Sequence, residues 1–194
     1  MLSDALSFLV RNLAGFFILN LLLRFYLQVA RASFAHPLAQ FTVKLTNFAV
    51  LPMRRIVPSM GGYDSATLLL AWLSCAVMEL SLLMLSHLPF TPLSSNGLIG
   101  LALLAILALL QFSLYLLFGA VVMQAILSWV NPYNPLSPIL DALTRPYLLP
   151  IRRILPSMGG LDLSPFVLIL ILQLILQFLI GAAELKLIAY AVLG

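Results

Sequence analysis

Charged side chains are scarce in this sequence. Asp, Glu, Lys and Arg together make up 8% of 194 residues, and only six residues are acidic. Water-soluble domains carry roughly a quarter charged residues. Because 63% of the residues are hydrophobic, the composition excludes an ordinary soluble domain and predicts an integral membrane protein. The net charge of +4 accompanies long apolar runs, which favours anionic lipid headgroups over nucleic acid as the partner.

Cysteine and histidine are also rare, with one Cys and two His. Cys75 alone cannot form a disulfide within the chain and is expected to be a small buried residue. His36 and His87 are expected near opposite membrane faces, too far apart to share a metal. Met60 and Met158 are more typical of lipid anchors than of haem or copper ligands. No nucleophilic triad, phosphate loop or carboxylate cluster is present, so we expect neither a cofactor nor an enzyme.

A duplicated segment organises the chain. Residues 52–64 (PMRRIVPSMGGYD) and 150–162 (PIRRILPSMGGLD) are near copies 98 residues apart. The register continues without a gap back to Pro37 and Pro135, and 15 of these 28 positions are identical, including Thr46 with Thr144. The repeat predicts two units, residues 1–96 and 97–194. Each unit would contain a long helix, an amphipathic segment, the motif and a second long helix.

Four stretches are long enough to cross a bilayer, which takes about 20 apolar residues. They run from about residue 6 to 30, 66 to 88, 98 to 130, and 164 to 192. The third would reach nearly 50 Å at ~1.5 Å per residue, so it must tilt, kink or extend beyond the bilayer. Because an even number of crossings separates the motifs, the prediction is an all-α membrane protein with four transmembrane helices in two parallel repeats.

Basic residues indicate the orientation of the chain. The motif side carries most of them, whereas Arg11 and Lys186 are the only ones expected toward the other face. The positive-inside rule therefore places the motifs in the cytoplasm and both termini outside. We expect a multi-pass protein of a bacterial inner membrane.

An amphipathic segment precedes each motif. Its apolar stripe is formed in the first unit by Leu38, Phe41, Leu45 and Phe48, and in the second by Ile139, Leu140, Leu143 and Tyr147. Both stripes have helical spacing. Either each segment lies in the membrane interface as an amphipathic helix, or it extends the preceding span out of the bilayer.

Each position of the motif has a physical interpretation. Pro52 and Pro150 are expected to break the preceding helix. The paired arginines would then lie at the depth of lipid phosphates, which guanidinium groups bind bidentately; they are Arg54, Arg55, Arg152 and Arg153. The remaining positions are expected to shape a turn and cap the following helix; they are Pro58, Gly61, Gly62, Asp64, Pro156, Gly159, Gly160 and Asp162.

Two interpretations of the motif stay open. An Arg–Asp pair across each turn would make a rigid structural knuckle. Alternatively, the arginines form a binding site for an anionic lipid headgroup or an acidic protein partner.

The doubled P-x-R-R-x-x-P-S-M-G-G-x-D element on four apolar spans resembles the YggT family, known as YlmG in plastids. Residues 131–135 (NPYNP) also resemble the Asn/Pro-rich segment after the third span in that family, and His36-Pro37 is a reduced version in the first unit. The resemblance implies loose links to osmotic stress tolerance and cell division in bacteria. In plastids it implies cytochrome maturation and nucleoid or division organisation. It implies no enzymatic mechanism.

Polar residues inside the spans are further candidates, because ionisable groups in a bilayer are costly. Glu79 lies in the second span, and Gln177 occupies the corresponding position of the fourth. Gln173, Gln177 and Glu184 are expected to share one protein-facing side, and Arg11 is expected to pair with Glu184. These groups either hold helices together or line a path for a proton or cation.

The sequence favours a non-enzymatic scaffold or assembly protein. Its cytoplasmic arginines would bind lipid headgroups or an acidic partner, while the spans contact another membrane protein or form a homo-oligomer. The alternative is a small channel or transporter subunit involved in osmotic stress tolerance, with Glu79 and Gln177 facing the conduit.

Overall fold

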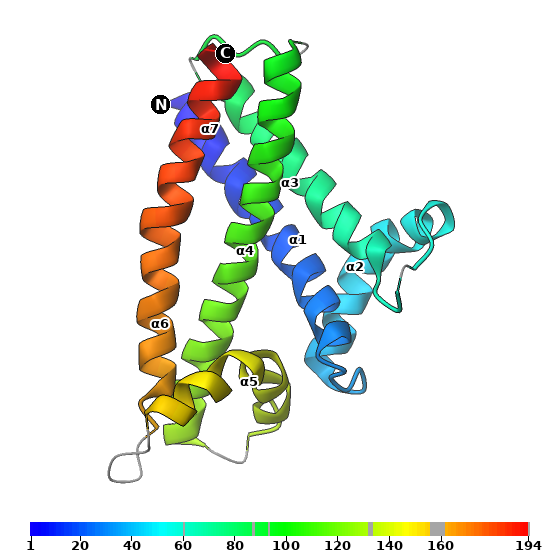
Figure 1. The fold of residues 1–194 in the computed structure, drawn as a ribbon. Coiled ribbons are helices and arrows are strands. Elements are labelled where there is room, and N and C mark those ends of the chain that lie inside the picture. Colours follow the sequence, from blue (N-terminus) through cyan, green and yellow to red (C-terminus); the bar gives the residue numbers. More distant parts are fainter. Residues whose placement is uncertain (60, 87, 93, 132–133, 156–161, 194) are drawn as a thin grey trace.

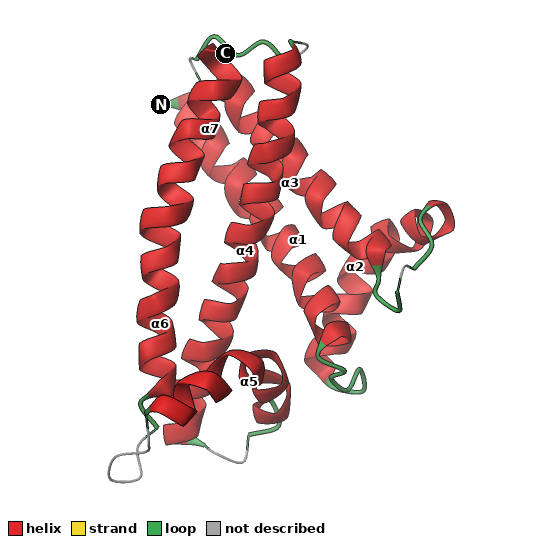
Figure 2. Cartoon of the chain, in the orientation of Figure 1, coloured by secondary structure: helices red, strands yellow, loops and turns green. Residues whose placement is uncertain are grey.

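The computed structural model describes residues 1–59, 61–86, 88–92, 94–131, 134–155 and 162–193. All regular structure in these ranges is helical (Figure 2). In chain order the helices are α1 (Leu2–Val29), α2 (Pro37–Ile56), α3 (Ser65–Leu85), α4 (Ser95–Val130), α5 (Ser137–Ile154), α6 (Ser164–Leu174) and α7 (Gly181–Leu193). A π-helical turn, η1 (Ile175–Ile180), joins α6 to α7 without a break.

Four helical segments are long and apolar enough to cross a membrane: α1, α3, α4, and the continuous rod from Ser164 to Val192. They confirm the four predicted spans. At ~1.5 Å per residue, α4 is about 54 Å long and exceeds a hydrocarbon core of ~30 Å. Figure 1 shows this helix running the length of the molecule beside the α6–α7 rod.

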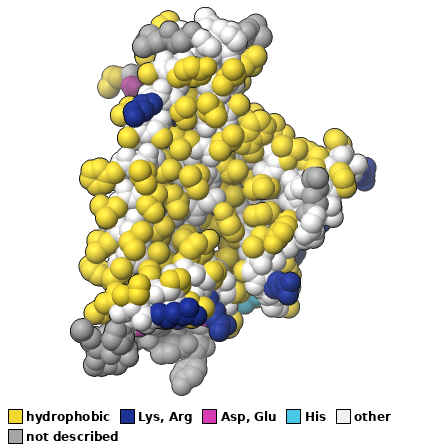
Figure 3. Space-filling model, in the orientation of Figure 1, with side chains coloured by type: hydrophobic (Ala, Val, Ile, Leu, Met, Phe, Trp, Pro, Cys, Tyr) yellow, Lys and Arg dark blue, Asp and Glu magenta, His cyan; other side chains and the backbone are white. Residues whose placement is uncertain are grey.

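The long helices pack in sequence, α1 on α3, α3 on α4, and α4 on α7. Buried Ile18, Leu21, Cys75 and Ala105 belong to one apolar cluster between the first three spans. Both termini lie at the same end of the molecule, and α5 lies across the other end (Figure 1). Figure 3 shows a mainly hydrophobic face between these ends, as expected for a surface in contact with lipid.

The amphipathic segments form α2 and α5 and leave apolar side chains outside. The side of α2 that packs on the protein carries Thr42, Thr46 and Val50, all buried. Phe41 and Phe48 of the predicted stripe are 53% and 73% exposed. These two side chains of α2 are therefore free to contact lipid.

Pro52 and Pro150 do not break their helices, so that prediction is wrong. α2 continues through Pro52 to Ile56, and α5 continues through Pro150 to Ile154. Both prolines are exposed, so solvent or headgroups can reach the carbonyl that each leaves without a donor four residues earlier. The paired arginines consequently lie in the last helical turn, where cations interact favourably with the helix dipole.

A close contact of α4 with α7 gives a first testable prediction. A Cβ atom added to Gly100 would lie 2.5 Å from Cβ and 2.9 Å from Cα of Ala191. Gly100→Ala should therefore push α7 away and lower the free energy of unfolding by about 1–3 kcal/mol. Gly119 of the same helix has open space around it, so Gly119→Ala is the matched control. Thermal unfolding in detergent, followed by circular dichroism, compares them, and an equal loss in both variants would contradict this packing.

Candidate functional site: the duplicated arginine motif

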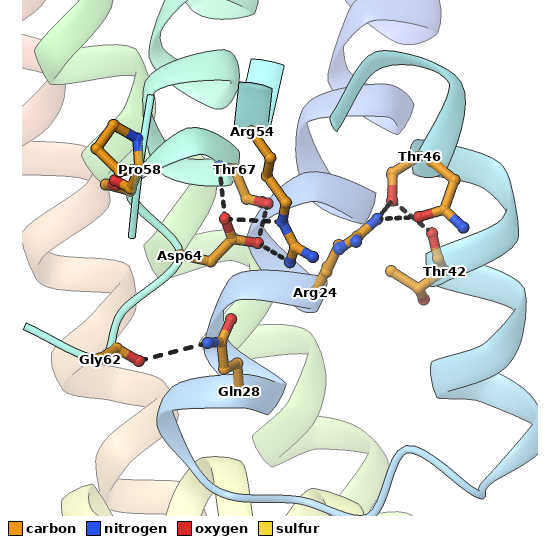
Figure 4. Close-up of polar contacts among 11 residues, drawn as sticks. Arg24, Gln28, Thr42, Thr46, Arg54, Pro58, Gly62, Asp64 and Thr67 are labelled. Carbon is orange, nitrogen blue, oxygen red and sulfur yellow. Dashed lines mark hydrogen bonds and ion pairs between the residues drawn. The ribbon is translucent and has the colours of Figure 1, made fainter. Parts of the chain in front are cut away.

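The first motif is built around a buried carboxylate. Asp64 caps α3: its Oδ1 accepts a hydrogen bond from the backbone N–H of Thr67 at 3.3 Å, and its Oδ2 accepts from the Thr67 hydroxyl at 2.5 Å. Arg54 at the end of α2 adds a two-bonded contact, with Nε 3.3 Å from Oδ1 and Nη2 on Oδ2. Figure 4 shows these bonds converging on the carboxylate. The predicted helix cap and the predicted Arg–Asp pair are both confirmed here.

Burial and hydrogen bonding act on Asp64 in opposite directions. Burial alone would raise the pKa of this carboxyl group, because it disfavours the charged form. Hydrogen bonds from Arg54 and Thr67, together with the Arg54 charge, outweigh that effect and lower the pKa below its ordinary value. Asp64 is therefore a carboxylate at neutral pH and serves as the counterion of the first motif.

Arg24 of α1 extends this polar cluster into the helix packing. Its side chain is 5% exposed, and its Nη1 donates to Thr46 Oγ1 at 2.8 Å and to Asn47 Oδ1 at 2.9 Å (Figure 4). The sequence analysis did not identify Arg24 as a site residue. The available signal was Thr46, a polar residue kept identical in the second copy.

The turn between α2 and α3 confirms the predicted role of two glycines. Gly61 and Gly62 have φ angles of 60° and 80°, a region that residues with a Cβ atom rarely adopt. Gln28 of α1 donates to the carbonyl oxygen of Gly62 at 3.5 Å. The turn is thus tied to the first span.

The second motif repeats the ion pair in a more open setting. Arg152 Nε lies 2.8 Å from Asp162 Oδ2, which confirms the predicted pair. The Asp162 side chain is 41% exposed, whereas that of Asp64 is 4% exposed. Burial would raise the pKa of Asp162, but hydrogen bonds from Ser164 and Arg152 outweigh it and lower the pKa. The second copy is therefore the more accessible one.

The second motif meets its following helix differently from the first. Pro156, Gly159 and Gly160 lie outside the described residues. Asp162 precedes the N-cap position of α6, Leu163, and its Oδ1 accepts from the backbone N–H of Ser164 at 3.0 Å. It therefore binds the backbone at the start of this helix without occupying the cap position that Asp64 has in α3.

Gln124 of α4 is the second site residue that the sequence analysis missed. The Thr144 hydroxyl, buried in α5, donates to Gln124 Oε1, whereas the corresponding Thr46 accepts from Arg24. The gapless sequence register pairs Arg24 with Val122, because Arg24 precedes Thr46 by 22 residues whereas Gln124 precedes Thr144 by 20. Only the structure aligns Arg24 with Gln124.

Arg55 and Arg153 differ from their neighbours in the motif. Both are exposed, and neither forms an ion pair or side-chain hydrogen bond with any residue that the structure describes. Arg54 and Arg152 are held by aspartates. Each motif thus contains one arginine bound internally and one whose guanidinium donors face outward.

The polar residues of the spans separate into two places. Glu79 and Glu184 line one cavity with Arg11, and Gln173 and Gln177 line another. Among the residues that the structure describes, Arg11 and Glu184 form no ion pair. The predicted pair is therefore wrong.

The prediction of one protein-facing stripe is also wrong. Gln177 lies in the π-helical turn, which contains more residues per turn than an α-helix and rotates everything after it. Glu184 therefore faces a different cavity from Gln173, and both glutamines are exposed.

Metal-ligand geometry is absent from the described part of the chain, where no three His, Cys, Asp or Glu side chains cluster. His36 instead caps α2, with Nδ1 accepting from the backbone N–H of Leu38 at 3.2 Å. His87, Met60 and Met158 lie outside the described residues.

Four membrane-length apolar helices define a multi-pass helical membrane protein. The chain belongs to the CCB3/YggT family, whose sequence model matches residues 3–85 and again residues 103–183.

Several curated bacterial proteins are similar over most of this chain. An uncharacterised Vibrio alginolyticus protein from the proC 3′ region is 39% identical over 180 residues, which cover 92% of this chain and 94% of that protein. Uncharacterised protein YggT of Escherichia coli K12 is 36% identical over 174 residues, 89% and 87% of the two chains. An uncharacterised Pseudomonas aeruginosa protein is 38% identical over 176 residues, 90% and 87%. No solved structure matches the chain.

Proposed function

We propose that this protein is a non-enzymatic membrane scaffold whose arginine motifs bind anionic lipid headgroups on the cytoplasmic side of a bacterial inner membrane. The observation that carries this proposal is that the two arginines of each motif differ in their partners. Arg54 and Arg152 are neutralised by aspartates, whereas Arg55 and Arg153 are exposed and unpaired among the described residues. Planar guanidinium groups suit bidentate binding of phosphate.

The surroundings of the free arginines support a lipid ligand. Arg55 follows an exposed apolar stripe of α2 that includes Phe41 and Phe48. An amphipathic helix with apolar side chains facing lipid and cations at its end is suited to the membrane interface. We therefore propose that α2 and α5 lie in the interface plane and hold the arginines at phosphate depth.

We propose that the chain consists of two parallel structural units, each with its own arginine motif. The family model matches two segments, and Arg24 and Gln124 contact threonines at corresponding positions of the repeat, Thr46 and Thr144. We propose that the units comprise residues 1–96 and 97–194, with both motifs cytoplasmic and both termini outside.

The proposal is tested with Arg55→Gln/Arg153→Gln in the full chain. At about 1 kcal/mol per arginine near an anionic surface, retention of phosphatidylglycerol should fall roughly 30-fold relative to phosphatidylcholine, with the melting temperature unchanged. Native mass spectrometry of the detergent-solubilised protein measures this retention. Lys186→Gln, a basic residue near the opposite end, is the control.

Two outcomes would contradict the proposal. One is unchanged phosphatidylglycerol retention in the double variant. The other is a wild-type protein that retains no lipid but co-purifies with an acidic protein, with that acidic protein lost from the double variant. The acidic protein would then be the ligand of the arginines.

A homo-oligomer or a membrane-protein partner fits the outer surface of the α6–α7 rod. Gln173 and Gln177 are exposed and line a cavity of about 420 Å³ with Tyr115. Exposed amides within a bilayer favour hydrogen bonds to another helix. Gln173→Leu/Gln177→Leu should accordingly reduce the mass of the complex measured in the same experiment.

The alternative proposal, a channel or transporter subunit acting in osmotic tolerance, needs Glu79 and Gln177 on one conduit. They line separate cavities that share only Tyr115 among the lining residues. Intact ion flux and osmotic tolerance in Glu79→Gln would remove this alternative.

A further inference from the structure

A second polar site lies far along the spans from the arginine motifs. A cavity of about 500 Å³ is lined by residues of α1, α3, α4 and α7. Its lining includes one guanidinium, Arg11, and two carboxylates, Glu79 and Glu184. Ligand pockets commonly have volumes of about 300–1,000 Å³, so the cavity is large enough for an organic group.

The depth of these charges makes them costly without a partner. Arg11 lies nine residues after the start of α1, Glu79 six residues before the end of α3, and Glu184 nine residues before the end of α7. At ~1.5 Å per residue these positions are about 9–14 Å from the helix ends. In the described part of the chain, none of the three forms an ion pair or a hydrogen bond. Such groups within a span normally pair or line a functional site.

The cavity lies between two spans that do not pack against each other. α1 and α7 both contribute lining residues, but their described residues do not pack against each other. Phe16, which lines the cavity five residues after Arg11, is 55% exposed. Since both helices belong to membrane-length segments and the cavity lining reaches the surface at Phe16, a lipid can reach the cavity from the bilayer.

The mixture of charges selects the ligand class. A simple cation would leave Arg11 without a counterion, and a simple anion would be repelled by Glu79 and Glu184. A zwitterion satisfies both signs. Three aromatic rings also line the cavity, Phe16, Phe112 and Tyr115, and such rings stabilise a nearby ammonium group. Leu19 and Met78 offer an apolar surface to the adjoining part of an amphipathic ligand.

We propose that this cavity binds the zwitterionic headgroup of an aminophospholipid, with its primary ammonium on Glu79 and Glu184 and its phosphate on Arg11. The ammonium group donates three hydrogen bonds, enough to serve both carboxylates. The headgroup gives each of the three charges an opposite partner and bridges α1 to α7, whose described residues do not pack against each other. The cavity lies toward the opposite end of the spans from the arginine motifs. Lipid binding there does not depend on the function proposed for the motifs.

The first test uses the wild-type chain in detergent and needs no mutation. Phosphatidylethanolamine and phosphatidylcholine of identical acyl chains are supplied together, and native mass spectrometry measures which is retained. Methylation removes every N–H donor of the ammonium but keeps its charge. Phosphatidylethanolamine should be retained at least about tenfold better. Equal retention of the two lipids would overturn the proposal.

Variants then assign the two halves of the headgroup. Glu79→Gln/Glu184→Gln should abolish the preference for phosphatidylethanolamine. Arg11→Gln should reduce the retention of both lipids equally, because both carry the phosphate. Asp4→Asn and Lys186→Gln are matched controls outside the cavity lining, and helicity by circular dichroism verifies folding. A preference that persists in the Glu79→Gln/Glu184→Gln variant would contradict the assignment.

Two further arms separate the possible sources and sites. Soluble phosphoethanolamine should compete only weakly with phosphatidylethanolamine for the cavity. If it displaced the diacyl lipid, the ligand would be a soluble headgroup compound and not a lipid. Arg55→Gln/Arg153→Gln should leave the phosphatidylethanolamine preference intact. Failure of the cytoplasmic proposal is thereby distinguishable from failure of this one.

Discussion

Asp64→Asn should lower the free energy of unfolding by about 2–3 kcal/mol, whereas Asp162→Asn should lower it by less than about 1 kcal/mol. The buried carboxylate of Asp64 accepts bonds from Arg54 and Thr67. Removing its charge weakens charge-assisted bonds and leaves a guanidinium without its counterion. Asp162 is 41% exposed, and ion pairs accessible to solvent contribute little.

The two substitutions are chemically identical and occur at corresponding positions, so each is the control of the other. Thermal unfolding of both variants in the same detergent gives the comparison. A larger loss for Asp162→Asn would mean that the open ion pair, and not the buried one, stabilises the fold.

The same pair predicts a pH dependence. The pKa of Asp64 is lowered in the folded protein from an ordinary value near 3.8. A carboxyl group with a lowered pKa contributes stability above its ordinary pKa and loses it as the pH falls through the folded value. The melting temperature of the wild type should therefore fall below about pH 4 more steeply than that of Asp64→Asn.

Arg24→Ala should be the most damaging change within a span, with a loss of about 2–4 kcal/mol. The substitution removes the donors to Thr46 and Asn47 and leaves a cavity where a nearly fully buried side chain was. Arg24→Gln should recover roughly half of the loss, because an amide can still bond Thr46. Gln124→Ala in the second unit should cost only about 1 kcal/mol.

A double-mutant cycle tests the contact itself. Arg24→Ala and Thr46→Val, alone and combined, should show a coupling energy of about 1 kcal/mol or more. Additive effects would indicate that the bond between the two side chains contributes nothing and that Arg24 acts through packing alone.

These predictions reflect an asymmetry between two similar sequences. The first motif is fixed by the buried cluster around Asp64 and Arg24, whereas the second has an exposed pair and a neutral Gln124 beside Thr144. We therefore expect the first motif to be the more rigid of the two.

Local features were predictable because each depends on a short stretch of chain. Asp64 caps the next helix, and Gly61 and Gly62 adopt the backbone angles expected of a glycine turn. Arg54 reaches Asp64 across ten residues of one turn. Pro52 was predicted to end α2 because proline has an intrinsic cost in a helix. Most helical stability in proteins comes from tertiary packing of an amphipathic face, which the sequence alone does not show.

The sequence by itself determined the four spans and the family, since runs of about 20 apolar residues cross a bilayer whatever they pack against. Only the tertiary structure decided which polar groups meet. Arg24 reaches Thr46, and Arg11 shares a cavity with Glu184, through the crossing of helices distant in sequence. The register of Glu184 also depends on a π-helical turn. Small changes in helix phase redirect a side chain, so neither composition nor the repeat could reveal these contacts.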